Sequence, residues 1–166
     1  MAAPDIVMYE EEFGQIKQII SKLRVDSNAK VVFLVDKNGQ QIAAHGEIEN
    51  LDTTSLASLT AGNVAATDGL ARLIGEREFS ILFHEGERDN IHISIVAGRV
   101  ILVVIFDERS SLGLVRLRVK KASGELHTVF TSIMEKVEKE RAAAGAAFES
   151  PFAEITDDDI DSLFSE

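Results

Sequence analysis

Two groups of short apolar segments, with a long helical pattern between them, most strongly limit what this chain can fold into. In the first group, residues 31–35 are continuously apolar and are followed by the turn dipeptide Asn38-Gly39. A continuous apolar run is typical of a strand buried on both faces. Asn-Gly favours a two-residue type I′ turn, because both positions need a positive φ angle. We therefore predict an antiparallel hairpin here.

The second group contains three strand-like segments in close succession. Residues 79–84 form the first, and the third is the apolar run Val100–Phe106. In the segment between them, isoleucines at 91, 93 and 95 alternate with His92 and Ser94. This alternation is typical of a half-buried strand. We predict three further strands, joined by short turns.

Residues 10–23, 55–76 and 112–137 have apolar side chains at helical spacing. The last segment could begin as a strand, because Arg116, Arg118 and Lys120 alternate with apolar residues. A helix explains the longer pattern, whose members recur every three or four residues. They are Leu112, Val115, Val119, Ala122, Leu126, Phe130, Ile133 and Val137. We predict a helix capped by Ser110 or Ser111.

The predicted order is therefore helix, two strands, helix, three strands, helix. Hairpin-linked strands form an antiparallel sheet, and helices pack on it as layers. We predict an α/β sandwich of the α+β class, with a five-stranded antiparallel sheet in the order α-β-β-α-β-β-β-α. A folded domain is expected over residues 1–141, a linker over 142–151 and an acidic amphipathic tail over 152–166.

Charge is concentrated at the C-terminal end of the chain. The formal net charge is −11, and seven acidic residues with no basic residue lie from Glu149 onwards. The other residues hold 21 acidic and 17 basic groups, a net of −4. Neither part has the basic footprint that nucleic acid requires. We expect no nucleic-acid partner.

Signals for other compartments and for intrinsic chemistry are missing from the sequence. There is no cysteine and no signal peptide, and the longest apolar run is too short to cross a bilayer. We expect a cytoplasmic protein without membrane insertion. No phosphate-binding loop, zinc motif or calcium loop occurs, and His45, His84, His92 and His127 are scattered. We expect no active site, no metal and no cofactor.

The helix predicted at residues 55–76 has a side that is almost bare of side chain. Its leucines, with Ala66, are expected to pack on the sheet: Leu56, Leu59, Leu70 and Leu73. The bare stripe then consists of Ala57, Ser58, Ala61, Gly62, Ala65 and Gly69, with Arg72 at its end. Glycine inside a helix costs about 1 kcal/mol relative to alanine. The stripe either packs tightly on the chain's own sheet or receives another protein.

Two further segments indicate association with other chains. The strand at residues 79–84 is expected at a sheet edge, where Phe79, Ile81, Leu82 and Phe83 could pair with a second copy. The acidic tail contains apolar anchors that solubility alone does not require. They are Phe152, Ile155, Ile160, Leu163 and Phe164. We favour a tail that docks on a partner over a tail that only aids solubility.

The chain resembles the roadblock (dynein light chain) family, and within it the MglB-type members. The element order is that of the family. The segments that carry the closer resemblance are "VMYEEEF", "AKVVFLVDKNGQ", "DTTSLASLTAGNVAA", "VVIFD…SLGLVRLR" and "SPFAEITDDDIDSLFSE". The similarity runs from about Val7 to the C-terminus.

This resemblance implies a homodimer that binds a Ras-like GTPase of the MglA type, as two copies to one GTPase, and stimulates its GTP hydrolysis. Such proteins set cell polarity and gliding motility, which implies concentration at a cell pole. GTP and Mg²⁺ would be bound by the GTPase. The resemblance assigns the bare stripe, Arg72 included, and the tail to GTPase binding.

The family is thought to reposition the GTPase's own catalytic groups without an arginine finger. The arginines that could reach a partner are Arg72, Arg77, Arg88, Arg99 and Arg109, and we expect none to act as a finger. Two alternatives stay open. One is a roadblock scaffold that binds a GTPase without accelerating hydrolysis, and the other is a small-molecule module, which would need a concave pocket.

Overall fold

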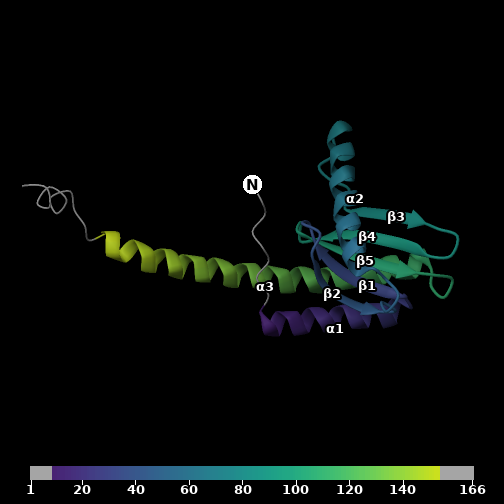
Figure 1. Cartoon of the computed structure of the whole chain (residues 1–166), viewed down its shortest axis with the longest axis horizontal. Coiled ribbons are helices and arrows are strands. Elements are labelled where there is room, and N and C mark those ends of the chain that lie inside the picture. Colours follow the sequence, from purple (N-terminus) through teal and green to yellow (C-terminus); the bar gives the residue numbers. More distant parts are fainter. Residues whose placement is uncertain (1–8, 154–166) are drawn as a thin grey trace, which may run out of the picture. The chain divides into compact units, whose positions relative to one another are not determined.

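The computed structural model describes residues 9–153, with side chains described to residue 145. The elements follow one another in the predicted order (Figure 1). They are α1 (Glu10–Ser27), β1 (Val31–Asp36), β2 (Gln41–Gly46), α2 (Thr53–Leu73), β3 (Ile81–Glu85), β4 (Asn90–Val96), β5 (Val100–Phe106) and α3 (Leu112–Ala153). The predicted fold class is confirmed. None of the helices in the described part is long and apolar enough to cross a membrane.

The five strands form one antiparallel sheet in the order β2-β1-β5-β4-β3. The two strands with continuous apolar runs, β1 and β5, pair in its centre and are buried along their whole length. The prediction of a strand buried on both faces is confirmed for β1, and β5 is buried in the same way. β3 pairs only with β4 among the described strands and therefore forms an edge.

Helices cover both faces of the sheet (Figure 1). α2 packs on one face, where Ala57, Ala61 and Val64 join a core cluster with side chains of β1, β4 and β5. α1 and the first part of α3 cover the other face. The end of α1 is tied to the start of α3, since the Asn28 amide donates to the Arg109 carbonyl and the Ser110 hydroxyl donates to the Ser27 carbonyl.

The turn between β1 and β2 differs from the predicted type I′ turn. Gly39 has a positive φ of 89°, but Asn38 does not. The Asp36 carboxylate accepts hydrogen bonds from the backbone N–H groups of Asn38 and Gln40, each at 2.9 Å, and this side-chain turn sets the loop geometry. The consecutive positive φ angles that a type I′ turn needs occur between β4 and β5, at Ala97 and Gly98.

The last helix confirms the choice of helix over strand. Ser111 caps it, since its hydroxyl oxygen accepts the Leu114 N–H at 3.3 Å. The helix continues through residues 142–151, so the predicted linker is helical. Alanine has the highest helix propensity, which explains why this alanine-rich segment is helical. The described residues divide into two units after Thr131, and the first unit holds the whole sheet; a domain end near residue 141 stays a prediction.

Candidate functional site

The face of α2 that packs on the sheet carries alanines, Thr60 and Val64 in place of most of the predicted leucines, which corrects the predicted orientation of this helix. Ala57 is 1% exposed, and Ala61, Val64 and Ala71 are also buried. Leucines that the spacing assigns to the core are on the outside: Leu59 is 73% exposed, Leu70 58% and Leu73 83%. Of the predicted core leucines, only Leu56 packs against the core cluster, and it is half-buried.

A close approach to the β1–β2 turn explains why small residues face inwards. A Cβ atom placed on Gly39 would lie 3.3 Å from the Ser58 Cα and 3.7 Å from the Ala61 Cβ. Larger side chains at these α2 positions would push the helix away from the turn and from the central strands. Ala57 and Ala61 therefore have a role within the protein and are not on the surface that a partner can reach.

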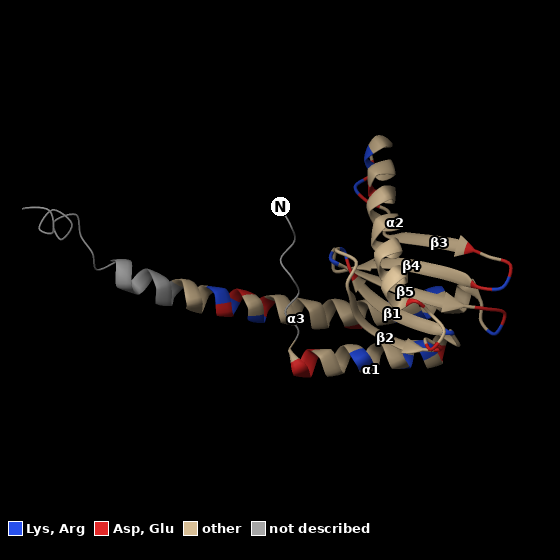
Figure 2. Ribbon diagram, in the orientation of Figure 1, with Lys and Arg blue, Asp and Glu red and all other residues tan. Residues whose placement is uncertain are grey.

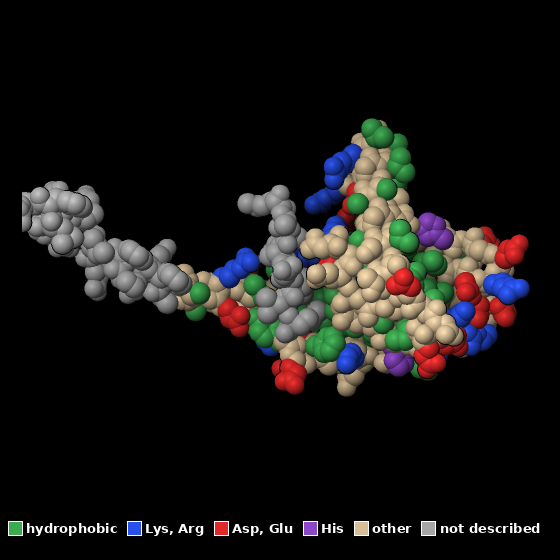
Figure 3. Space-filling model, viewed as in Figure 1, with side chains coloured by type: hydrophobic (Ala, Val, Ile, Leu, Met, Phe, Trp, Pro, Cys, Tyr) green, Lys and Arg blue, Asp and Glu red, His purple; other side chains and the backbone are tan. Residues whose placement is uncertain are grey.

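The other predicted docking residues of α2 do lie on the surface. Ser58, Gly62, Ala65, Gly69 and Arg72 are all exposed, and we call these five the small-residue band. Beside it on the helix surface run Leu59, Ala66, Leu70 and Leu73, which are exposed as well. We call these four the leucine ridge. Figure 3 shows hydrophobic side chains along this helix, and Figure 2 shows that it carries almost no charge before its C-terminal end.

The edge strand β3 lies next to α2. Ile81 is 52% exposed, whereas Phe79, Leu82 and Phe83 are half-buried. Leu82 packs on the core cluster beneath α2, and the Phe83 ring stacks on Phe106 with centroids 6.2 Å apart. The predicted edge position is confirmed. Two of its predicted dimer residues contact the protomer's own core, so the strand offers mainly its backbone edge and Ile81.

A hydrogen bond that no sequence pattern predicted connects α2 with β3. The Asn63 amide nitrogen lies 2.8 Å from His84 Nε2. Since an amide N–H donates, Nε2 is the acceptor, and a neutral His84 carries its proton on Nδ1. The available signal was Asn63 itself, a polar residue that interrupts an otherwise small and apolar helix. This bond helps to fix the helix relative to the sheet edge.

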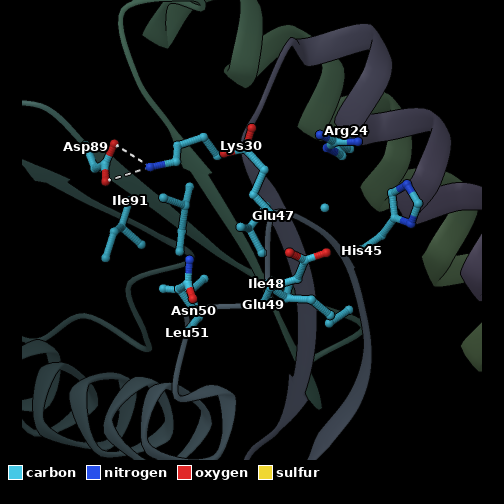
Figure 4. Close-up of a pocket in the computed structure, with 14 residues that line it drawn as sticks. Arg24, Lys30, His45, Glu47, Ile48, Glu49, Asn50, Leu51, Asp89 and Ile91 are labelled. Carbon is cyan, nitrogen blue, oxygen red and sulfur yellow. Dashed lines mark hydrogen bonds and ion pairs between the residues drawn. The ribbon is translucent and has the colours of Figure 1, made fainter.

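A cleft of about 780 Å³ lies where β2 leads into α2 (Figure 4). Its floor includes Val31, Ile91 and Ile105, which belong to or pack on the core cluster. Charged side chains of both signs line it, and Lys30 pairs with Asp89 at 3.2 Å. The concave pocket that a small-molecule module needs is therefore present. Two basic and three acidic side chains line it, so the charges of the lining nearly balance.

One of the five candidate arginines is fully occupied within the protein. The Arg109 guanidinium contacts the carboxylates of Asp107 at 2.9 Å and Glu47 at 3.3 Å. Its hydrogen bonds hold the pKa of Asp107 below, and that of Arg109 above, their ordinary values. Arg72, Arg77, Arg88 and Arg99 are exposed. Releasing Arg109 for a partner would break a three-residue network.

Two expectations remain, the absence of a metal site and the presence of an acidic tail. Within residues 9–145, no group of three histidine or acidic side chains is placed to hold a metal ion. The predicted tail anchors Ile155, Ile160, Leu163 and Phe164 lie outside the described residues. Phe152 falls within the backbone of α3, and its side chain is outside the described part.

Comparison with known proteins places this geometry in a family. The Roadblock/LC7 domain model matches residues 15–106. Among solved structures, MglB from Myxococcus xanthus is 64% identical with a TM-score of 0.73, over 76% of this chain and 96% of that chain. The gliding protein MglB from Thermus thermophilus is 30% identical with a TM-score of 0.74, over 79% and 99%. A structure described as MglB with a tetrameric arrangement is 29% identical with a TM-score of 0.73, over 80% and 99%. The chain belongs to the Roadblock/LC7 domain family and is similar in sequence and structure to MglB.

Proposed function

We propose that this protein is a homodimeric activator of a Ras-like GTPase of the MglA type, and that it has no active site of its own. The observation that carries the proposal is the outer surface of α2, where the small-residue band, whose one charged member is Arg72 at its end, runs beside the leucine ridge. A contiguous exposed apolar surface on a folded protein marks a site of association. Similarity to MglB over most of the chain supports this class of partner.

The leucine ridge and the β3 edge together supply a dimer interface. A second copy related by a twofold axis would pair β3 with β3 and satisfy the free backbone groups of the edge. The same axis would bring the two ridges towards each other, because Asn63 and His84 hold α2 close to β3. In this arrangement Ile81 takes part directly, while Phe79, Leu82 and Phe83 support the strand from within the protomer.

The small-residue band serves the GTPase. Residues with short side chains allow a second backbone to approach closely without losing side-chain entropy. Two bands, one from each protomer, would form one surface that receives one GTPase. The stoichiometry is then two copies of this protein to one GTPase. The acidic tail contributes further contacts through its apolar anchors. GTP and Mg²⁺ are held by the GTPase, and concentration at a cell pole follows from its polarity role.

Stimulation without an arginine finger is part of this proposal, and the ion pairs of Arg109 support it for that residue. Arg109 is held by two carboxylates, and withdrawing it would cost both ion pairs. Of the others, Arg72 lies on the proposed GTPase surface itself. A finger supplied in trans is worth about 10³–10⁵ in rate. We expect Arg72→Ala to weaken binding and to leave most of the stimulation at saturation.

Single-turnover GTP hydrolysis by the cognate GTPase, with and without this protein, tests the proposal. The test variant carries Ala65→Arg and Gly69→Arg in the small-residue band. The matched control carries Gly14→Arg and Gln18→Arg, which add the same charge to exposed positions of α1. We expect stimulation by the parent and the control, and none by the test variant, with all three dimeric by sedimentation. Binding by the parent without stimulation would instead establish a scaffold.

A further inference from the structure

The first turns of α3 carry a basic surface on an otherwise acidic protein. Residues 110–124 contain four basic side chains and no carboxylate, in a chain with a net charge of −11. Two exposed arginines elsewhere do have acidic neighbours: Arg77 lies between two glutamates, and Arg88 lies between Glu87 and Asp89. No carboxylate lies within residues 110–124 to neutralise this charge, and Glu108 and Glu125 flank the segment.

This surface also has an apolar centre and open space around it. Leu117 is 62% exposed, and Lys120 and Lys121 follow it one turn later on the same side. Gly113 and Gly124 lie on that side before and after them, and a Cβ on either glycine would meet no atom within 4 Å. We call Gly113, Arg116, Leu117, Lys120, Lys121 and Gly124 the α3 stripe.

The cations of the α3 stripe are available for a partner. Arg116, Lys120 and Lys121 are exposed. Among the described residues none of the three forms an ion pair, since the ion pairs there involve Lys30 and Arg109. The stripe is thus a flat face with one exposed leucine and three free positive charges. A segment that combines acidic and apolar side chains would be complementary to this face.

The sequence contains such a segment in its own tail. Residues 149–166 hold seven acidic residues and no basic residue, and Ile160, Leu163 and Phe164 are its apolar members near the aspartates. We propose that the acidic tail of one copy docks on the α3 stripe of a second copy. The stripe begins α3, whereas the tail follows the last residue of the same helix, Ala153. In this proposal a second copy supplies the tail, and cross-linking between differently tagged chains distinguishes this source from the same chain.

The docked tail would be held by charge and by one apolar contact. Exposed ion pairs are individually weak, so three cations with Leu117 give a reversible contact that salt weakens. This interaction does not depend on GTPase activation. If the tail also binds the GTPase, the two sites compete for one segment, and the tail must leave the stripe before it can engage the GTPase.

Cross-linking in the full-length chain tests the proposal, because the parent has no cysteine. Chains with Gly124→Cys and chains with Ser165→Cys are co-expressed with tags of different size, so the mixed disulfide can only join two copies. The matched control replaces Gly124→Cys by Lys37→Cys, in the exposed β1–β2 turn. A third preparation adds Lys120→Glu and Lys121→Glu to the Gly124→Cys chain. No GTPase is present.

We expect about fivefold more mixed disulfide for the Gly124 position than for Lys37 at low salt. The excess should disappear in 1 M NaCl, where the Debye length is about 3 Å, and with the two glutamates. Equal yields at the two positions, or a yield that charge reversal leaves unchanged, would overturn the proposal. A chain that carries both cysteines can also be diluted with cysteine-free protein. If its disulfide forms only within the chain at every dilution, the assignment of the tail to a second copy is overturned.

Discussion

α2 and the first part of α3 use their residues in opposite ways. The first part of α3 buries most of its large apolar side chains, among them Val115 and Leu126, and exposes polar and basic ones together with Leu117. α2 buries alanines and a valine and exposes Leu59, Leu70 and Leu73. Folding of the protomer therefore uses the large apolar side chains of α3, whereas those of α2 remain available to other chains. Burial within one chain does not account for the sequence of α2.

The largest expected effect concerns a buried leucine of α3. Leu126→Ala should lower the free energy of unfolding by about 2–5 kcal/mol, because it leaves a cavity at a fully buried position. Leu59→Ala, at an exposed position of α2, should change it by no more than about 0.5 kcal/mol at low protein concentration. Urea unfolding at two protein concentrations measures both. Equal losses for the two variants would remove the contrast between the helices.

A second pair of substitutions tests whether the leucine ridge forms the dimer interface. Leu70→Glu with Leu73→Glu should raise the homodimer dissociation constant about a hundredfold, since two apolar contacts are lost and charges are placed in the interface. Val25→Glu, at an exposed apolar position of α1, is the control and should leave dimerisation unchanged. Sedimentation velocity over a concentration series gives both constants. An unchanged constant for the double variant would assign the ridge to another partner.

Overpacking the inner face of α2 should have a smaller effect. Ala61→Leu should destabilise the protein by about 1–3 kcal/mol, because the added side chain meets the β1–β2 turn at Gly39. Ala66→Leu adds the same atoms on the exposed side and should be tolerated. Thermal unfolding of the two variants compares the faces of one helix. If Ala66→Leu were the more damaging change, the observed orientation of α2 would be wrong.

The smallest expected effect is a pH dependence from the α3 side of the sheet. His92 is buried without a hydrogen-bond partner for its ring among the described residues. Burial, and secondarily the Arg116 charge, hold its pKa below the ordinary value of 6.5. As pH falls through 6.5, the unfolded chain takes up a proton that the folded protein does not, so stability decreases.

That loss should approach about 1.4 kcal/mol per pH unit and should end once the pH passes below the pKa of the folded state. His92→Leu should flatten the dependence between pH 7 and 5, whereas the exposed His127→Leu should retain it. Urea midpoints at several pH values provide the measurement. A His92→Leu profile as steep as that of the parent would contradict this account.

Sequence patterns predict the fold well because, in most elements, the large apolar residues are the buried ones. β1 and β5 carry the continuous apolar runs and are central strands, and α3 follows the spacing of Leu112 to Val137. For α2 the same rule fails. The rule takes leucine as the mark of the core, whereas the distance between helix and turn is set by Gly39, and only small residues fit there. That distance is a tertiary property that α2 alone does not reveal.

The candidate site is predictable in part for the same reason. The exposed members of the small-residue band, such as Gly62 and Gly69, stand out in the sequence because glycine within a helix needs an explanation. The leucine ridge does not stand out in the sequence, because the leucines of an amphipathic helix are normally expected on its buried face. Likewise, Asn38-Gly39 suggests a type I′ turn, but the carboxylate of Asp36 outweighs the dipeptide preference.

The hydrogen bond between Asn63 and His84 provides a natural spectroscopic probe. It joins the helix of the proposed partner surface to the strand of the proposed dimer edge. The ¹⁵N chemical shifts of an imidazole distinguish its two ring nitrogens, so the His84 signals report whether Nε2 still accepts this bond. Heteronuclear NMR on uniformly labelled protein could therefore follow both association events at one residue, without any attached fluorophore or added tag.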